Sequence, residues 1–444
     1  MNLFKNYLQK KVGYHNLEAR EKHTFKLHLG FMLTDGFVQG VLLLNEFVFL
    51  RSLKGSSYQL SFLFQFSVVA FIFLIFISEW MKRIRNKQKM VNITGLITRL
   101  PLALLLFFPG NNSAFTVNSI YHYIFLAIFL TYYLGNLIVF PMINLFLKNN
   151  YRHTLFGPLF SYTTLANKII MLIVAFLYGW VLDLDPTAYR WVFAIAALAG
   201  ILSTFFLSRI QYVEDTIEKI GSGILTSVKA SVNNLKNIMQ TNLPFRHFEW
   251  GFMFYGFAFM STTTVITIFF EKHLGLSYFS VAAYKNIYNI IALFMIPFFG
   301  RKLSNIDPRN FAAITFLSIF LFLSSLVLTY YFPQHTYIMG IKFYYAMIPY
   351  LLFQAVFAAT MSLLWSIGSA YFCKPSEAGD YQSVHLFLTS ARSLFAPILG
   401  VLFYELYGYV FTFAAGAIFL TIAIVIMFWS KNKYKVIYHN GEGN

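Results

Sequence analysis

Long apolar segments separated by short polar loops recur along the whole chain. Six of them precede a polar stretch at residues 212–247, and six follow it. Each is about as long as an α-helix must be to cross the hydrocarbon core of a bilayer, roughly 20 residues. The pattern predicts an all-α membrane protein with spans at 27–50, 58–80, 91–109, 119–147, 156–182, 187–211, 249–271, 279–300, 310–332, 338–371, 383–405 and 408–430.

The polar stretch divides the chain and has a pattern of its own. From Ile217 to Met239 its apolar residues recur every three or four positions, which predicts an amphipathic helix. That helix lies either on the inner leaflet or against the cytoplasmic ends of the spans. The predicted domains are an N-terminal six-helix bundle (1–211), a cytoplasmic amphipathic linker (212–247), a C-terminal six-helix bundle (248–430) and a cytoplasmic tail (431–444).

Composition and charge agree with a protein that crosses the membrane many times. Only 11% of the residues are charged, against roughly 25% in soluble domains. Most of the 34 Lys and Arg residues fall in alternate loops and the tail, the asymmetry that places those loops in the cytoplasm. This distribution accounts for the net charge of +17 without nucleic-acid binding. The first 25 residues contain no apolar signal-peptide core, so we expect a multi-pass plasma-membrane protein, as in a bacterial inner membrane, with both termini in the cytoplasm.

The first apolar segment carries acidic residues, which are costly in lipid. At about 100° per residue, its polar side chains fall within about 40° of one another on a helix and extend over about 27 Å. They are His28, Asp35, Gln39 and Glu46. Such a stripe predicts a polar path through the membrane. The alternative is that Asp35 only pairs with a buried cation and joins two helices.

Two stretches of sequence point to a known family. They are NLPFRHFEWGFMFYGFAFM at 242–260 and PSEAGDYQSVHLFLTSARSLFAPILGVLFYELYG at 375–408. With the two sets of six spans, they resemble the seventh helix and the eleventh-helix region of the major facilitator superfamily. The family's short loop motif is only partly kept. After the second span, Ser78 and Lys82 replace its Gly and Asp while Arg83 and Lys87 fit it; after the eighth, Gly300 and Arg309 fit it while Ser304 replaces the Asp.

The resemblance implies two six-helix halves around a central cavity, and transport by alternating access. Helices one, four, seven and ten of that family line the cavity, which places the Asp35 stripe on the cavity side. Helices two, five, eight and eleven form the interface between the halves. The implied protein is a monomer that binds a small-molecule substrate, protons and the lipid bilayer, and it requires no cofactor.

Several other polar residues lie inside predicted spans. The fifth span carries Lys168, and the eleventh carries His385, Thr389 and Arg392 on one helix face. A cation from each half suits an anionic group on the substrate. The alternative is that both cations close ion pairs, with Asp35 or with loop acids, or reach toward water. The predicted substrate-binding residues are Gln39, Tyr132, Asn136, Lys168, His385, Thr389 and Arg392.

Arg99, in the third span, has a weaker claim to a role at the site. It lies near the cytoplasmic end of a scaffold helix. We therefore expect it to reach toward water or to pair with Glu79.

These residues predict a proton-coupled secondary transporter for a small organic solute, anionic or amphiphilic, with Asp35 and Glu46 as the proton-coupling residues. Alternatives are a polyspecific drug or metabolite exporter, and a non-transporting membrane protein on the same fold. The sequence contains no HExxH, no nucleotide-binding glycine loop and no Cys or His cluster at metal-ligand spacing. We therefore expect neither an enzyme nor a metal site. The single cysteine, Cys373, excludes an internal disulfide bond.

Overall fold

The computed structural model describes residues 17–73, 77, 80–81, 83–110, 114–116, 119–212, 224–303, 306–374 and 377–434. Five of the residues named above lie outside them, namely Ser78, Glu79, Lys82, Ile217 and Ser304. Contacts divide the chain into two compact units. Unit 1 contains Met1–Val48 and Phe73–Ile224, and unit 2 contains Phe49–Ile72 and Leu225–Asn444.

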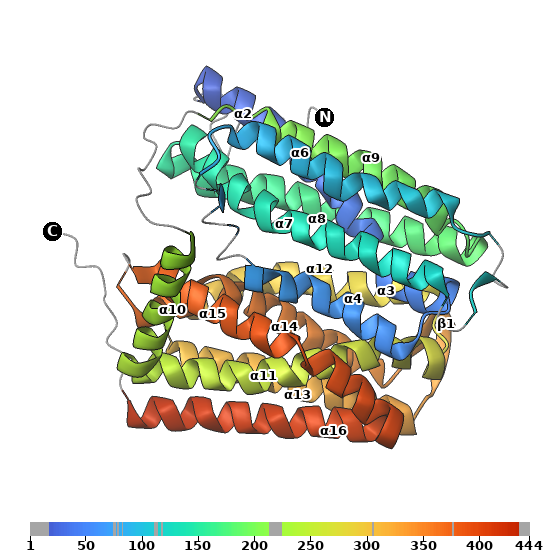
Figure 1. The fold of residues 1–444 in the computed structure, drawn as a ribbon. Helices are drawn as coiled ribbons and strands as arrows, with labels where there is room; N and C mark the ends of the chain where they lie inside the picture. The colour runs from blue at the N-terminus through green and yellow to red at the C-terminus, as the bar shows by residue number, and fades with distance from the viewer. Residues whose placement is uncertain are drawn as a thin grey trace. The chain divides into compact units, whose positions relative to one another are not determined.

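The regular elements of unit 1 are all helices among its described residues. Within it α2 packs against α8 and α9, and α6 packs against α7 and α9. Figure 1 shows these helices in blue to green. Their bounds are α2 Ala19–Leu42, α3 Asn45–Phe47, α6 Lys87–Arg99 with its 3-10 continuation η4 Leu100–Phe107, α7 Ile120–Asn150, α8 His153–Leu184 and α9 Tyr189–Ser208.

Unit 2 holds the remaining elements. α11 packs along α16, and α13 packs against both α14 and α16. The short helix α4 joins this unit through hydrogen bonds of 3.1 Å from Gln65 to the Leu394 carbonyl and from Ser390 to the Val68 carbonyl. The elements are η2 Val48–Ser52, α4 Ser57–Val69, η3 Ala70–Phe73, α10 Ile224–Thr241, α11 Leu243–Ile268, η6 Phe269–His273, α12 Tyr278–Leu303, α13 Pro308–Tyr331, β1 His335–Ile338, β2 Ile341–Tyr344, α14 Met347–Ile367, η7 Ser369–Phe372, α15 Ala378–Ser393 and α16 Ala396–Lys433.

The described residues contain 10 helices that are long and apolar enough to cross a membrane. The last, Gly379–Lys433, covers the predicted spans 383–405 and 408–430, and a shorter apolar helix at Ser57–Phe73 covers part of the predicted second span. Gly408 interrupts the long helix with φ 79° and ψ −175°, a conformation available essentially to glycine alone. The all-α multi-pass architecture is therefore confirmed, whereas a count of 12 crossing helices stays a prediction.

Two predicted spans differ from the structure in detail. Residues 335–344, part of which was assigned to the tenth span, form an antiparallel hairpin in which His335 pairs with Tyr344. Its turn residues Met339 and Gly340 have φ of 50° and 80°, the positive values typical of a two-residue hairpin turn. The first span is not one continuous helix, because α2 ends at Leu42 and a π-helical turn, η2, follows α3.

This π-helical turn has a counterpart after α11. The η2 and η6 segments are each five residues long, and each is followed by a residue with positive φ, Lys54 at 53° and Gly275 at 58°. A serine hydroxyl then accepts a hydrogen bond of 3.1 Å from the amide three residues later, Ser56 before α4 and Ser277 before α12. The two serines, like the two positive-φ residues, lie 221 positions apart in the sequence.

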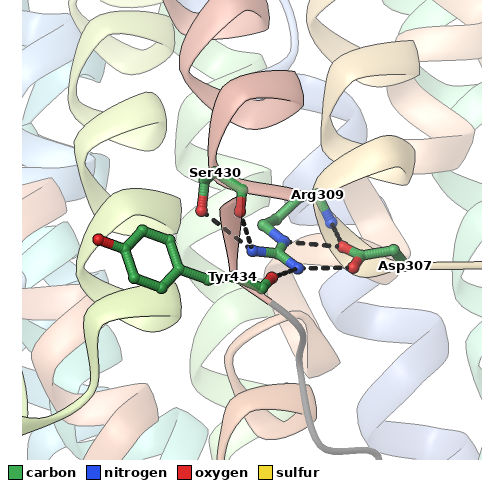
Figure 2. Close-up of polar contacts among 4 residues, drawn as sticks. All are labelled: Asp307, Arg309, Ser430 and Tyr434. Carbon is green, nitrogen blue, oxygen red and sulfur yellow. Dashed lines mark hydrogen bonds and ion pairs between the residues drawn. The ribbon is translucent and has the colours of Figure 1, made fainter. Parts of the chain in front are cut away.

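Arg309 joins the start of α13 to the end of α16 (Figure 2). Its side chain is fully buried. Nε and Nη2 donate to the two carboxylate oxygens of Asp307 at 3.0 and 2.8 Å. Nη1 donates to the Ser430 carbonyl and Nη2 to the Tyr434 carbonyl, both at 2.8 Å. A planar guanidinium is suited to this role because it presents several donors in fixed directions.

We predict that Arg309→Met lowers the stability of unit 2, since it leaves the Asp307 carboxylate without its cation and two carbonyls without a donor. Removing one partner of a buried ion pair costs about 3–5 kcal/mol. The readout is the melting temperature of the purified protein in detergent. Lys302→Met, at an exposed lysine of α12, is the control, and equal melting temperatures for the two variants would contradict the prediction.

Candidate functional site

The Asp35 carboxylate of α2 is held by two neutral amides. Gln39, one helical turn later, donates to its Oδ2 at 2.5 Å. Asn167 of α8 donates to the same oxygen at 3.3 Å and to the Met32 carbonyl at 2.9 Å. Asn167 is buried, while Asp35 and Gln39 keep part of their surface exposed. The predicted pair Asp35 and Gln39 therefore lies together, with Asn167 as a partner from another helix.

Glycines let α2 and α8 come close enough for these contacts. A Cβ added at Gly36 would lie 2.6 Å from the Asn167 carbonyl oxygen, and one at Gly40 would lie 2.7 Å from the Met171 carbonyl oxygen. Small residues at such contacts are typical of transmembrane helix pairs. The close approach places the Asn167 side chain beside Asp35.

Arg99 lies close to Asp35, contrary to the sequence-based interpretation. It is buried, and it donates to Asn136 Oδ1 at 2.7 Å and to Thr98 Oγ1 at 2.6 Å. Its guanidinium carbon lies 4.6 Å from the ring centroid of Tyr132, and its positive charge acts on Asp35. Arg99 therefore belongs to the polar cluster together with Tyr132 and Asn136, two of the predicted substrate-binding residues.

Lys168 is the second cation whose charge acts on Asp35. Its side chain is half-buried on α8, and Nζ lies 3.8 Å from the sulfur of Met171. Within the described ranges, no Lys or Arg nitrogen lies within 4.0 Å of the Asp35 carboxylate. Asp35 thus has two nearby positive charges and contacts neither, which differs from a closed ion pair.

The two ends of the predicted stripe lie away from this cluster. His28 is fully buried, with Nε2 3.2 Å from Thr163 Oγ1 and Nδ1 3.3 Å from the Tyr151 hydroxyl. Glu46 lies in α3, beyond the end of α2, and its charge acts on Tyr133 of α7. His28, Asp35 and Gln39 therefore still share one face of α2, whereas Glu46 lies beyond the end of that helix.

In unit 2 the α15 face that carries His385, Thr389 and Arg392 contacts Glu249, an acidic residue for which no role was predicted. His385 Nδ1 lies 2.9 Å from Glu249 Oε1 and 3.2 Å from Oε2, and both side chains are 2% exposed. Glu249 is part of the quoted α11 sequence and received no role. An acidic residue at the edge of an apolar segment is itself the signal that could have identified it.

Arg392 is buried between α15 and α11. It donates through Nη1 to the Phe252 carbonyl, and its guanidinium carbon lies 5.6 Å from the ring centroid of Tyr255. Three buried polar atoms on this face have no hydrogen-bond partner among the described residues, namely His385 Nε2, Thr389 Oγ1 and Arg392 Nε.

The contacts of Arg392 repeat those of Asn167 in unit 1. Each side chain donates to a carbonyl of the neighbouring helix, Met32 in α2 or Phe252 in α11. The glycine four residues after that carbonyl lies against the Asn167 backbone in unit 1 and against the Arg392 guanidinium in unit 2. The two carbonyls are 220 residues apart, and the two donors are 225 residues apart. The residue before the glycine is an aspartate in unit 1 and a tyrosine in unit 2.

The sequence profile of the Major Facilitator Superfamily matches residues 27–390. The chain belongs to the Major Facilitator Superfamily. A search of curated protein sequences found no significant match. Within the described residues, no group of three or more His, Cys, Asp or Glu side chains could hold a metal ion.

Solved structures of this superfamily's fold resemble the chain over almost its whole length. A mutant form of the nucleoside transporter NupG has a TM-score of 0.64 at 14% identity, covering 94% of this chain and 100% of its own. An auto-inhibited POT family peptide transporter has a TM-score of 0.67 at 12% identity, covering 96% and 99%. A D-xylose–proton symporter has a TM-score of 0.61 at 15% identity, covering 92% and 96%. At these identities the likeness shows the fold alone.

We predict that Gly36→Ala destabilises the α2–α8 contact of this superfamily member, because the added methyl would lie 2.6 Å from a backbone oxygen and one helix must shift. The matched control is Gly300→Ala on α12, where an added Cβ meets nothing within 4 Å. Alanine is favoured over glycine in a helix by up to about 1 kcal/mol, so the control should be neutral or slightly stabilising. A melting temperature for Gly36→Ala at or above that of Gly300→Ala would contradict the prediction.

Proposed function

We propose that this protein is a secondary active transporter that uses the proton gradient to move a small organic solute, anionic or amphiphilic, by alternating access. The supporting observation is the state of Asp35, a membrane-embedded carboxylate bound by two neutral amides with two cations close by but not in contact. Membership of the Major Facilitator Superfamily supports transport in general. We further propose a monomer in the plasma membrane with cytoplasmic termini.

The arrangement suggests how a proton and an anion could be exchanged. Protonation of Asp35 removes its negative charge while Gln39 and Asn167 remain hydrogen-bond partners of the neutral acid. The charges of Arg99 and Lys168 are then uncompensated, and an anionic group on the solute restores neutrality. Release of the solute favours the return of the Asp35 charge. In this scheme Glu46 is a second proton-coupling residue.

Each unit carries proposed solute contacts. In unit 1 they are Gln39, Tyr132, Asn136 and Lys168, and in unit 2 they are His385, Thr389 and Arg392. Cationic and hydrogen-bonding side chains orient an anionic solute, while the abundant aromatic side chains bind its apolar part. The same aromatic richness, 53 Phe and 29 Tyr, favours a polyspecific exporter as the second candidate.

The names of the resembling structures provide a first panel of solutes, namely nucleosides, peptides and D-xylose, to which organic carboxylates are added. A rise in melting temperature identifies a ligand, because a molecule that binds only the folded state stabilises it. The ligand is then used for transport in proteoliposomes. An enzyme or a sensor would bind a ligand without moving it.

We predict that Asp35→Asn abolishes accumulation of that solute driven by a proton gradient but preserves counterflow, since an amide cannot carry the proton but has nearly the size and shape of the carboxyl group. Uptake and counterflow in proteoliposomes are compared with those of Glu405→Gln, a control at an exposed acid of α16. Undiminished gradient-driven accumulation by Asp35→Asn would rule out Asp35 as the coupling residue.

We also predict that Lys168→Gln weakens binding of an anionic solute about 10-fold, the loss of one charge-assisted hydrogen bond, and leaves a neutral analogue unaffected. Lys272→Gln, at an exposed lysine, is the control. Apparent affinities are measured by concentration-dependent counterflow. If the anionic solute and its neutral analogue lose affinity equally, Lys168 has only a structural role.

A further inference from the structure

Glu249 of α11 and His385 of α15 form an acid–histidine pair inside unit 2. His385 Nδ1 lies 2.9 and 3.2 Å from the two carboxylate oxygens of Glu249, and each side chain is 2% exposed. The pair lies about 10 Å along each helix from its first residue, Leu243 or Ala378. Both helices begin in segments that the charge distribution predicts to be cytoplasmic, so the pair is nearer to that side of the membrane.

The walls around the histidine are aromatic. The His385 ring is edge-on to Phe252 of α11 at 4.9 Å and to Trp365 of α14 at 5.1 Å, measured between ring centroids. Such surroundings disfavour a net charge, so an imidazolium among them requires a carboxylate beside it. Glu249 supplies that carboxylate. One proton added to an ionised Glu249 and a neutral His385 makes the pair electrically neutral.

The charge of Arg392, two helical turns beyond His385, also acts on this pair. Its guanidinium carbon lies 5.6 Å from the ring centroid of Tyr255. α4, which packs against α11 and α15, and α14 contain no Asp, Glu, Lys, Arg or His. The other charged side chains and histidines of the surrounding helices are exposed, lie in the first turn of their helix or are already paired. They are Lys229, Lys236, Arg246, His247, Arg309, Asp380, Glu405, Lys431 and Lys433.

Two effects on proton uptake therefore oppose each other. Burial favours the protonated pair, because that pair is neutral. Arg392 favours the unprotonated pair, because its positive charge attracts the negative charge of Glu249. An anionic solute in unit 2 would offset the charge of Arg392 and shift the balance toward proton uptake.

The geometry also determines which ring nitrogen gains the proton. An ionised carboxylate only accepts hydrogen bonds, so Nδ1, which contacts both oxygens of Glu249, carries the hydrogen of the neutral ring. Nε2 is then an acceptor, and it is buried without a hydrogen-bond partner among the described residues. Protonation places a hydrogen on Nε2 and turns this atom from an acceptor into a donor.

We propose that Glu249 and His385 form a proton-binding site of unit 2, in which one proton taken up at His385 Nε2 makes that atom a donor to the solute. Glu249 neutralises the imidazolium that results. His385 is a solute contact in the function proposed above, and this inference names the protonation state in which it binds a solute oxygen. Only the solute step rests on that function, since proton binding does not require transport.

The test titrates the full chain in detergent with the proton as the only probe, from about pH 9 to pH 4, the range that spans the ordinary histidine titration. Trp365 is the reporter, because an imidazolium quenches the emission of a tryptophan in ring contact more strongly than a neutral imidazole does. The other five tryptophans are exposed and are replaced by phenylalanine, namely Trp80, Trp180, Trp191, Trp250 and Trp429. We expect the emission to fall on acidification along a one-proton curve.

Two variants assign this signal to the pair. His385→Gln still donates to Glu249 but binds no proton, so the pH-dependent change in emission should disappear. Glu249→Gln removes the charge that neutralises the imidazolium, so the midpoint should require at least about a 10-fold higher proton concentration, the value of one charge-assisted hydrogen bond. The matched controls are His335→Gln in β1 and Glu405→Gln in α16, both at exposed positions. Each control should titrate as the single-tryptophan protein does.

Nitrogen NMR of isotope-labelled histidine gives a second readout that needs no tryptophan replacement. The chain contains 10 histidines, and the signal absent from His385→Gln is assigned to His385. We expect a hydrogen on Nδ1 alone at high pH and on both ring nitrogens at low pH. This measurement decides the proposal if the single-tryptophan protein does not fold.

Three results would overturn the proposal. A pH-independent Trp365 emission, or a change that persists in His385→Gln, would mean that His385 is not the group that titrates. Equal midpoints for Glu249→Gln and Glu405→Gln would mean that Glu249 does not stabilise the imidazolium. A neutral ring with its hydrogen on Nε2 would mean that the proton is held by Glu249.

The outcomes also separate this inference from the transporter proposal. Proton binding by the pair in a protein that moves no solute would contradict only the transporter proposal. Asp35-dependent transport by a protein in which His385 takes up no proton would contradict only this inference.

Discussion

A glycine at the helix contact is the constraint on which both polar sites depend. Water is absent from the bilayer core, so helices associate through tight packing and interhelical hydrogen bonds rather than through the hydrophobic effect. Gly36 and Gly256 permit that packing, because a Cβ at Gly36 would collide with the Asn167 backbone and one at Gly256 would collide with the Arg392 guanidinium. The polar side chain beside each glycine then reaches a carbonyl across the contact, which makes a polar group tolerable at that depth.

Hydropathy and helical periodicity depend only on neighbours along the chain, and they predicted the apolar helices and placed Asp35 and Gln39 on one face of a helix. Arg99 was misjudged, since the distance of a residue from the end of its own helix does not show which neighbouring helix its side chain faces. Its hydrogen-bond partner Asn136 lies 37 residues away on α7. No role was predicted for Glu249 for the same reason, because its partner His385 is 136 residues away in the sequence. Only tertiary packing brings these groups together.

The helix breaks were also invisible to hydropathy, which does not distinguish an α-helix from a π-helical turn. The stretches RSLKGSSYQL and KHLGLSYFSV, which begin at Arg51 and Lys272, match at a leucine and at the capping serine. The position with positive φ is Lys54 in one and Gly275 in the other. A repeat that preserves backbone conformation with so few identical residues is found by comparing structures.

The same repeat explains why the shared architecture does not determine function. At equivalent places, Asn167 and Arg392 satisfy the same kind of backbone carbonyl, so either residue serves the packing. The two residues differ in the hydrogen-bonding capacity and charge that remain once the carbonyl is satisfied. The amide of Asn167 also binds a carboxylate whose charge can change, whereas Arg392 keeps a permanent charge and a free Nε. A single substitution at such a position alters the chemistry offered to a ligand while leaving the helix contact intact, and so evolution can vary specificity on this fold with little loss of stability.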